Sequence, residues 1–336
     1  MVEDGFLRLD TEERRRLCEQ TSLRTGLPVS MVEKDFWVCW ALEQLFGLPG
    51  LGEFLTFKGG TSLSKGWRLI ERFSEDIDVV LNRAYLGFGE EDPSKNRLRK
   101  LRKRCQEAIA SELLPALSVR IAEHLDGFGD WAVALASVED DREQETILFS
   151  YPTLGLERAA YIRPSVRIEL GARSDVEPAE MPTISSYLSE QFPEAVTPSA
   201  TAIRTVAPRR TFWEKAMLVH EESFRPPDRV RPSRLSRHYY DLWCLIRRGI
   251  AADAVRDDSL FDRVASRREV FWGQSWVNYE SLRRGSLRLA PSSDLEGWRR
   301  DYRDMSEMLF GEVPTFDEIL VEVQAFEDAF NRSEPG

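Results

Sequence analysis

The chain has 336 residues, 42% of them hydrophobic and 31% charged, which suits two domains and is enough to bury a core. Its net charge of −11 argues against a general nucleic-acid coat, and no apolar run approaches the roughly 20 residues of a membrane-spanning helix. Three histidines and four widely spaced cysteines without a CxxC pair argue against a zinc site or a disulfide framework. The acidic start does not read as a secretion signal, so we expect a cytoplasmic protein without a membrane segment.

The first two thirds of the chain mix helical and strand patterns. Apolar residues at helical spacing, such as Phe36, Trp37 and Trp40, indicate helices, and alternating or β-rich stretches indicate strands. In chain order we expect helices at 11–25 and 31–47, a strand at 54–57, a helix at 61–72, a strand at 76–81, a helix at 95–124 and strands at 131–139, 145–152 and 165–172.

After a Pro- and Ser-rich stretch at 174–200, the pattern becomes mostly helical. The expected helices are 211–223, 236–248, 259–273, 294–310 and 315–331. The sequence therefore predicts an α+β fold: a mixed sheet flanked by helices, followed by a C-terminal helical domain. We place a helical segment at 1–50, the catalytic domain at 51–210 and the helical domain at 211–336.

Two carboxylates in the predicted strand 76–81 carry the strongest chemical signal. Residues i and i+2 of a strand point to the same side, so Asp76 and Asp78 project together. Like charges so close are costly without a cation. Mg²⁺ prefers oxygen ligands and often takes one or two carboxylates together with substrate phosphates, and Mn²⁺ could replace it. The pair predicts a metal site for phosphoryl or nucleotidyl transfer.

A glycine turn precedes these carboxylates. Gly59 and Gly60 would let the backbone approach a nucleoside triphosphate, and the following helix start offers free N–H groups. Thr61 and Ser62 add hydroxyl donors for the phosphates, and Lys65, one helical turn after Thr61, could also contact a phosphate. The spacing is not that of a P-loop. Alone, a DxD is usually a solvated strand end and a GG usually a turn, but the combination within 25 residues is far more specific.

The segments GGTSLSK and RFSEDIDV resemble the AbiEii group of nucleotidyltransferase-like toxins, which includes the MenT toxins, within the DNA polymerase β-type nucleotidyltransferase superfamily. The resemblance continues in EKDFW (33–37), RIELGAR (167–173), TFWEKAMLVH (211–220) and RHYYDLWCL (237–245). It implies a nucleotidyltransferase-type sheet, an NTP substrate and a cognate antitoxin. It also implies an RNA acceptor, and the 3′ end of tRNA is the leading candidate.

The resemblance also implies further site residues. Glu169 would complete the metal site or act as base, although a salt bridge with Arg167 or Arg173 is an equal alternative. Lys215 would reach the triphosphate, whereas a lysine is more commonly a surface residue. Asp241 would orient Lys215 or contact the nucleotide. Glu33, Lys34 and Asp35 are interpreted first as a structural brace.

Basic segments at 94–105 and 225–237 could contact RNA phosphates, although a solvated face is nearly as good an explanation. Two alternatives to RNA nucleotidylation remain open. The acceptor could be a protein or small molecule, with transfer of either a nucleotidyl or a phosphoryl group, or the chain could be a non-catalytic relative that binds a nucleotide or partner.

Overall fold

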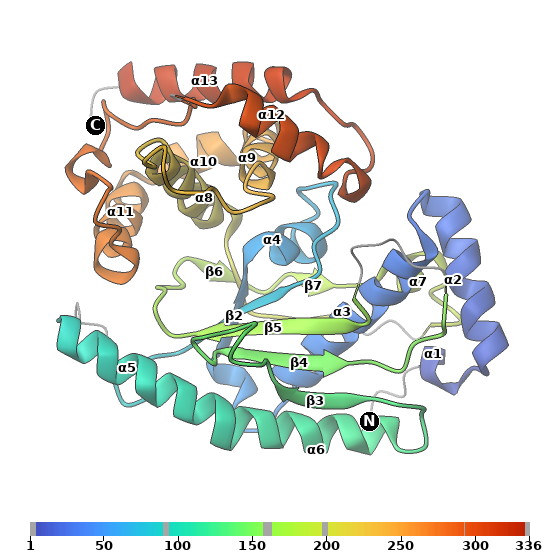
Figure 1. Ribbon diagram of the computed structural model, residues 1–336. Helices are drawn as coiled ribbons and strands as arrows, with labels where there is room; N and C mark the ends of the chain where they lie inside the picture. Colours follow the sequence, from blue (N-terminus) through green and yellow to red (C-terminus); the bar gives the residue numbers. More distant parts are fainter. Residues whose placement is uncertain (1–4, 90–93, 157–162, 197–200, 292, 333–336) are drawn as a thin grey trace. The chain divides into compact units, whose positions relative to one another are not determined.

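The computed structural model describes residues 5–89, 94–156, 163–196, 201–291 and 293–332 (Figure 1). The chain divides into two compact units. The first comprises 1–67 and 73–205, and the second comprises 68–72 and 206–336. The second unit begins close to the predicted boundary at 210, and the roles assigned to the predicted domains remain predictions.

The first unit is built on a mixed sheet in the order β3-β4-β5-β2-β1-β9-β6 (Figure 1). Strands β1–β2, β3–β4 and β4–β5 pair antiparallel, whereas β2–β5 and β1–β9 pair parallel. The strands are β1 (Leu55–Lys58), β2 (Ile77–Leu81), β3 (Ala132–Leu135), β4 (Thr146–Ser150), β5 (Ser165–Gly171), β6 (Ala179–Glu180) and β9 (Thr205–Val206). A separate pair is formed by β7 (Thr183–Ile184) and β8 (Thr201–Ala202).

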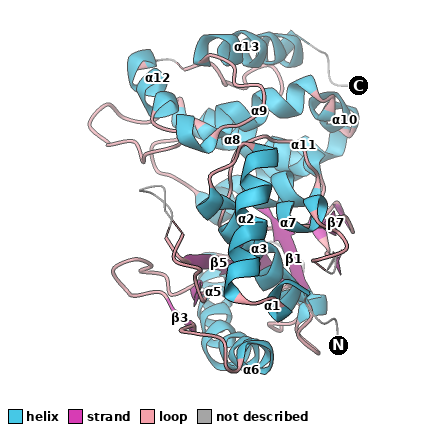
Figure 2. Cartoon of the chain, turned by 90° about the vertical axis from the view of Figure 1, so that its right-hand side faces the viewer, coloured by secondary structure: helices cyan, strands magenta, loops and turns pink. Residues whose placement is uncertain are grey.

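Aromatic side chains fix α3 (Val29–Phe46) against this sheet. The Trp37 ring packs edge-on against Phe149 of β4, and Trp40 lies between Phe149 and His124. These tryptophans are almost fully buried, so they serve the core, as expected. Helix α2 (Thr11–Thr25), which starts with a capping box at Asp10, runs beside α3 (Figure 2).

One long helical run follows the β1–β2 region. It consists of α5 (Lys95–Ala108), a π-helical turn at Ile109–Leu113 and α6 (Leu114–Leu125), as expected for 95–124. Residues at helical spacing are fully buried along it, including Leu101, Cys105 and Leu117. The short helices α1 (Gly5–Arg8), α4 (Gly59–Thr61) and α7 (Tyr187–Gln191) complete the α-helices of this unit among the described residues.

The second unit is helical. Its elements are α8 (Pro208–Glu222), α9 (Arg237–Arg247), α10 (Ile250–Arg256), α11 (Asp258–Trp272), α12 (Leu295–Arg303) and α13 (Phe316–Arg332). Trp213 of α8 sits fully buried against Phe261 and Phe330 and donates its indole N–H to the Ala254 carbonyl. A buried aromatic cluster with a satisfied polar atom thus joins α8, α10, α11 and α13.

The α+β prediction, with a mixed sheet and C-terminal helices, is confirmed. The predicted helix 61–72 is wrong in its second half. Helical structure begins at α4 (Gly59–Thr61) and ends with the π-helical turn Ser62–Gly66, and Arg68 has a positive φ of 54°. In the described residues, no helix is long and apolar enough to cross a membrane, and all four cysteines are free and buried.

Candidate active site

Three adjacent strands place polar residues in one row across the sheet. Asp78 on β2 lies in register with Lys58 on β1 and with Glu169 on β5. Neighbours across a ladder share a face, so the carboxylates of Asp78 and Glu169 project to the same side. The alternate residues Ile77 and Ile168 are fully buried on the other face.

Asp76 lies immediately before β2 rather than within it, which corrects the predicted strand start. Its backbone carbonyl accepts a hydrogen bond from Thr61 Oγ1 at 2.5 Å, so the glycine turn and the start of β2 are tied together. The negative charges of both Asp78 and Asp76 act on Glu169. The three carboxylates proposed for the metal site therefore form one electrostatic group.

Glu169 carries the clearest sign of this grouping. Partial burial, and then the charges of Asp78 and Asp76, raise the pKa of Glu169 to about 7, while Arg167 opposes the shift. The expected alternative is also present, because Arg167 Nη2 lies 3.6 Å from Glu169 Oε1, although this distance is long for a hydrogen bond. Arg173 pairs instead with Glu145, at 3.1 Å.

Gly59 is the residue that lets Asp78 approach the turn. Its φ is +81°, a conformation that favours glycine. A Cβ built at this position would lie 1.9 Å from Asp78 Oδ2. The carboxylate therefore occupies the space that a side chain would fill, and the backbone of the turn lies directly beside it.

The hydroxyl groups after the turn have partners within the first unit. Thr61 Oγ1 also bonds with Ser74 Oγ at 2.9 Å, and Ser62 Oγ donates to the Gly59 carbonyl at 2.9 Å. Both side chains are fully buried. They hold the turn in shape, which leaves backbone N–H groups as the better candidates for contacting a nucleotide.

The predicted brace is present, and it includes Lys65, which the sequence predicts as a nucleotide contact. Lys65 is buried, pairs with Asp35 at 2.7 Å and lies 3.5 Å from the Tyr187 ring centroid. Burial by itself lowers the pKa of Lys65, but Asp35 outweighs it and the net pKa is raised. This geometry gives the Lys65 ammonium group a structural partner and does not support the predicted phosphate contact.

The rest of the EKD segment supports the same region. Lys34 forms an ion pair with Glu75, the residue before Asp76. Glu33 accepts a hydrogen bond from the Leu154 backbone N–H at 2.6 Å. Glu33, Lys34 and Asp35 are all buried and each has a polar partner, so they fix the segment that leads into the candidate acidic site.

The second unit holds a separate buried ionic cluster. Asp241 of α9 is 0% exposed and accepts hydrogen bonds from Arg72 Nε at 2.7 Å and Nη2 at 2.8 Å. Lys215 Nζ of α8 lies 2.7 Å from the same carboxylate. Although burial alone would raise the pKa of Asp241, Arg72 and Lys215 hold it well below its usual range. Asp241 is thus in direct contact with Lys215, as one of its two predicted roles requires, and the role itself stays a prediction.

This cluster has an excess of positive charge. Two cations share the single carboxylate of Asp241, and burial followed by the charge of Arg72 lowers the pKa of Lys215. An anion would relieve that imbalance. Sequence reasoning missed Arg72, because its partner lies 169 residues away and no local pattern marks it.

A family model decides the identity of the fold and chemistry. The model described as "Nucleotidyl transferase AbiEii toxin, Type IV TA system" matches residues 40–332. The chain belongs to the AbiEii family. This AbiEii protein is therefore a nucleotidyltransferase of the toxin type, for which an NTP substrate and a cognate antitoxin are implied.

Among solved structures, the AbiEii protein is similar to MenT4, the nucleotidyltransferase toxin Rv2826c from Mycobacterium tuberculosis H37Rv. The two share 18% sequence identity with a TM-score of 0.46, over 95% of this chain and 99% of that one. No protein with a curated description matches the AbiEii protein.

The donor set of the AbiEii protein was expected to hold a divalent metal. In the described ranges, no group of three or more His, Cys, Asp or Glu side chains is arranged to hold a metal ion by itself. Mg²⁺ commonly takes only one or two carboxylates and completes its coordination with water and substrate phosphates. Asp78 and Glu169, side by side on β2 and β5, fit such a shared site, and the charge of Asp76 acts on it as well.

Proposed function

We propose that this AbiEii protein transfers a nucleotidyl group from an NTP to an acceptor hydroxyl, most readily at the 3′ end of tRNA, in the cytoplasm. The single observation that carries the proposal is the strand register that places Glu169 beside Asp78, with the Asp78 carboxylate against the backbone of the glycine turn at Gly59. Three carboxylates held together against their own repulsion are the arrangement that a metal-bound triphosphate would stabilise.

Asp76, Asp78 and Glu169 would hold Mg²⁺, which when bound neutralises phosphate charge and lowers the pKa of a nearby hydroxyl. Glu169 lies beside Asp78 on the neighbouring strand, so its carboxylate is also the candidate to accept the hydroxyl proton. In the proposed reaction the acceptor oxygen bonds to the α-phosphorus, the bond to the β-phosphate oxygen breaks, and pyrophosphate leaves. The hydroxyl proton passes to Glu169.

The remaining residues would bind and position the triphosphate. Backbone N–H groups at Gly59 and Gly60, at the start of α4 and beside the Asp78 carboxylate, would contact phosphate oxygens. Lys215 would contact the triphosphate as a cation whose orientation is set by Asp241. Arg72 anchors the same carboxylate and so acts as a positioning residue.

A labelling experiment tests this function against its rivals. The purified full-length protein is incubated with Mg²⁺ or Mn²⁺, total tRNA and each NTP, labelled on either the α- or the γ-phosphate. The proposal expects α-label on tRNA and none from γ-label. Label on protein or on small molecules would show that the acceptor is not tRNA, and transfer of γ-label would indicate a kinase.

Asp76→Ala is the matched inactive variant. It is expected to abolish both transfer and growth inhibition in cells, because it removes a proposed metal ligand without changing the turn. If Asp76→Ala inhibits growth as strongly as the wild type, the chain acts by binding rather than by catalysis. Co-expression of the cognate antitoxin should relieve inhibition by the wild type.

A further inference from the structure

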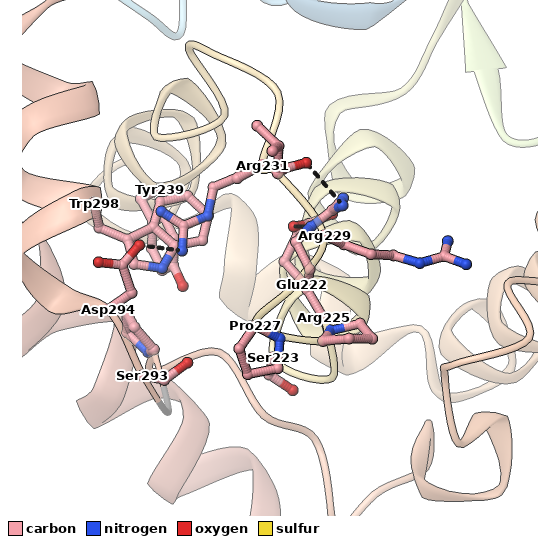
Figure 3. Close-up of a pocket in the computed structure, with 13 residues that line it drawn as sticks. Glu222, Ser223, Arg225, Pro227, Arg229, Arg231, Tyr239, Ser293, Asp294 and Trp298 are labelled. Carbon is pink, nitrogen blue, oxygen red and sulfur yellow. Dashed lines mark hydrogen bonds and ion pairs between the residues drawn. The ribbon is translucent and has the colours of Figure 1, made fainter.

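A cavity of about 320 Å³ lies within the second unit, along the segment that joins α8 to α9 (Figure 3). Glu222 at the end of α8, Tyr239 of α9 and Trp298 of α12 contribute to its lining. The joining segment itself contributes Arg225, Arg229 and Arg231. No role in the proposed reaction accounts for this concentration of arginines.

Two of these arginines are held in fixed orientations. Arg231 donates from Nη2 to Asp294 at 3.1 Å, and its guanidinium lies 3.8 Å from the centroid of the Trp298 ring (Figure 3). Arg225 donates from Nε and Nη2 to the two oxygens of Glu222, at 2.6 and 2.7 Å. A guanidinium has five N–H donors, so one carboxylate does not saturate it, and Arg231 Nε has no acceptor in the described part of the chain.

The third arginine gives the cavity a net positive charge. Arg229 is exposed and forms no ion pair with any described residue, and its side chain extends away from the pairs made by Arg225 and Arg231 (Figure 3). The lining therefore contains three arginines and only two carboxylates, those of Glu222 and Asp294, while Asp228 of the same segment lies outside the lining. In a chain of net charge −11, such a local excess indicates an anionic ligand.

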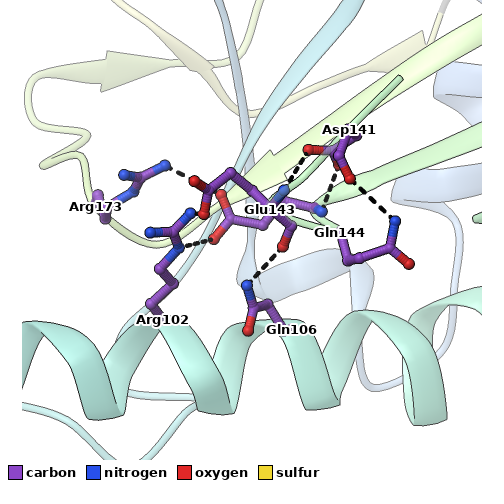
Figure 4. A network of polar contacts seen from close by, with 7 residues as sticks. Arg102, Gln106, Asp141, Glu143, Gln144 and Arg173 are labelled. Carbon is purple, nitrogen blue, oxygen red and sulfur yellow. Dashed lines mark hydrogen bonds and ion pairs between the residues drawn. The ribbon is translucent and has the colours of Figure 1, made fainter. Parts of the chain in front are cut away.

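The basic helix α5 in the first unit is a weaker candidate. Arg102 pairs with Glu143 and Glu145. Glu143 lies in the loop between β3 and β4, as do Asp141 and Gln144 (Figure 4). Arg104 pairs with Glu112 at 2.8 Å. Arg102 and Arg104 are therefore paired within the fold, whereas Arg99 and Lys100 are exposed, as the solvated-face explanation for this segment expects.

We propose that the cavity and residues 225–231 bind the phosphodiester backbone of the RNA acceptor. The inference rests on the proposed transfer to RNA. Pro226 and Pro227 restrict the segment, so its arginines lose little conformational freedom on binding. Planar guanidinium groups match phosphate oxygens in pairs, and several of them along one segment suit successive phosphates better than a single free anion.

The experiment measures binding of fluorescently labelled total tRNA to the full-length protein at a series of KCl concentrations. Arg229→Ala/Arg231→Ala is expected to weaken binding about tenfold or more, as expected for loss of charge-assisted hydrogen bonds. The slope of log K against log salt should become shallower by about 0.9 for each phosphate that the variant no longer neutralises. Arg231→Lys keeps the charge and should preserve the slope while lowering affinity.

Arg256→Glu is the control, because Arg256 is a 77% exposed arginine of the same unit that does not line the cavity. It should leave tRNA affinity within about twofold, as for an exposed surface residue. Binding of labelled NTP and the thermal unfolding midpoint are measured for each variant, so that misfolding is recognised.

Each outcome separates the two proposals. If the wild type modifies tRNA and the double variant binds it with unchanged affinity and slope, the cavity assignment is wrong while the function stands. Loss of NTP binding in place of tRNA binding would make the cavity a nucleotide site and overturn the assignment. If the wild type neither binds nor modifies tRNA, the RNA acceptor and the cavity assignment fail together.

Discussion

A single hydrogen in place of a methyl group at position 59 determines where Asp78 can lie. Gly59→Ala would place a Cβ 1.9 Å from Asp78 Oδ2, on a backbone with φ of +81°. The carboxylate must move, and a displacement of about 1 Å can cost about 10²-fold in rate. We expect a loss of that size in nucleotide transfer, measured with α-labelled NTP.

Gly50→Ala is the control for this substitution. Gly50 has a similar φ of +69° but nothing within 4 Å of its Cβ position. It shares the backbone strain without the collision, so transfer should stay within about threefold of wild type, as expected when the catalytic geometry is undisturbed. Equal losses in both variants would show that strain, and not the Asp78 contact, matters.

Glu169 gives the reaction its expected pH dependence. Because its pKa is raised to about 7, the side chain is largely neutral below that pH and ionised above it. If Glu169 accepts the proton, the transfer rate measured at subsaturating Mg²⁺ should rise as pH passes through about 7. Bound metal favours the carboxylate, so saturating Mg²⁺ should move this rise to lower pH.

Glu169→Gln should remove the rise and lower the rate by about 10²–10⁴-fold, the usual contribution of a general base. Glu139→Gln, an exposed glutamate of the same unit, should leave both unchanged. A pH profile in Glu169→Gln identical in shape to that of wild type would assign the titration to another group.

At the scale of elements, the turn between β1 and β2 depends on the brace from α3. The double variant Lys65→Met/Asp35→Asn removes the ion pair. In the wild type Asp35 accepts a hydrogen bond from the Tyr187 backbone N–H at 2.7 Å, and the amide oxygen of the asparagine can still accept it. Removing both charges avoids leaving one buried alone, which would cost about 3–5 kcal/mol. We expect KM for NTP to change by no more than about twofold, because Lys65 faces Asp35 rather than the substrate.

The KM of the double variant is compared with that of Lys58→Met, because Lys58 lies at the end of β1, in register with Asp78. A rise in KM of tenfold or more in the Lys65 and Asp35 double variant, with folding intact by circular dichroism, would restore Lys65 to the phosphate site.

Asp241 joins α8, α9 and the segment that contains Arg72. Its pKa lies below the usual value of about 3.9, so its ionised form favours the folded state. That stabilisation is complete above about pH 4 and is lost as pH falls toward the lowered pKa of the folded state. Asp241→Asn should cost about 3–5 kcal/mol in urea unfolding at pH 7, and less in acid.

The control for Asp241→Asn is Asp253→Asn. Asp253 is half exposed on α10 and pairs with Arg256, and exposed pairs contribute roughly 0–1 kcal/mol. A destabilisation by Asp241→Asn no larger than that of the control would mean that Arg72 and Lys215 find other partners.

Helical periodicity predicted the long elements well and the turn region poorly. Leu63 and Ile70 share a helical face in the sequence and are both buried, yet the helix ends at Gly66 and Arg68 takes a left-handed conformation. Ile70 belongs to the second unit, so its burial reflects tertiary packing rather than helix continuation. Strands of two residues, such as β6 and β9, are too short to carry a period.

At the scale of the whole molecule, local spacing predicts Asp76 and Asp78 as site residues, and the resemblance to AbiEii proteins points to Lys215 and Asp241. The ion pairs of Arg72 with Asp241 and of Lys65 with Asp35 join residues distant in sequence, so neither followed from local pattern. The difference between Lys65 and Lys215 illustrates the limit. Both are buried lysines paired with an aspartate, but only the Asp241 carboxylate is shared with a second cation.

The second unit is discontinuous, because residues 68–72 belong to it while the chain on either side of them belongs to the first. One cut near residue 205 therefore does not yield two complete pieces. A fragment starting at Val206 would lack Arg72 and keep Asp241 with one cation only. The polypeptide that leads into the candidate metal site also supplies an internal part of the helical unit. Recombination between relatives should therefore exchange residues 68–72 together with the helical unit from residue 206 onward. An exchange of only one of the two would disrupt the helical unit and the segment that leads into the candidate metal site.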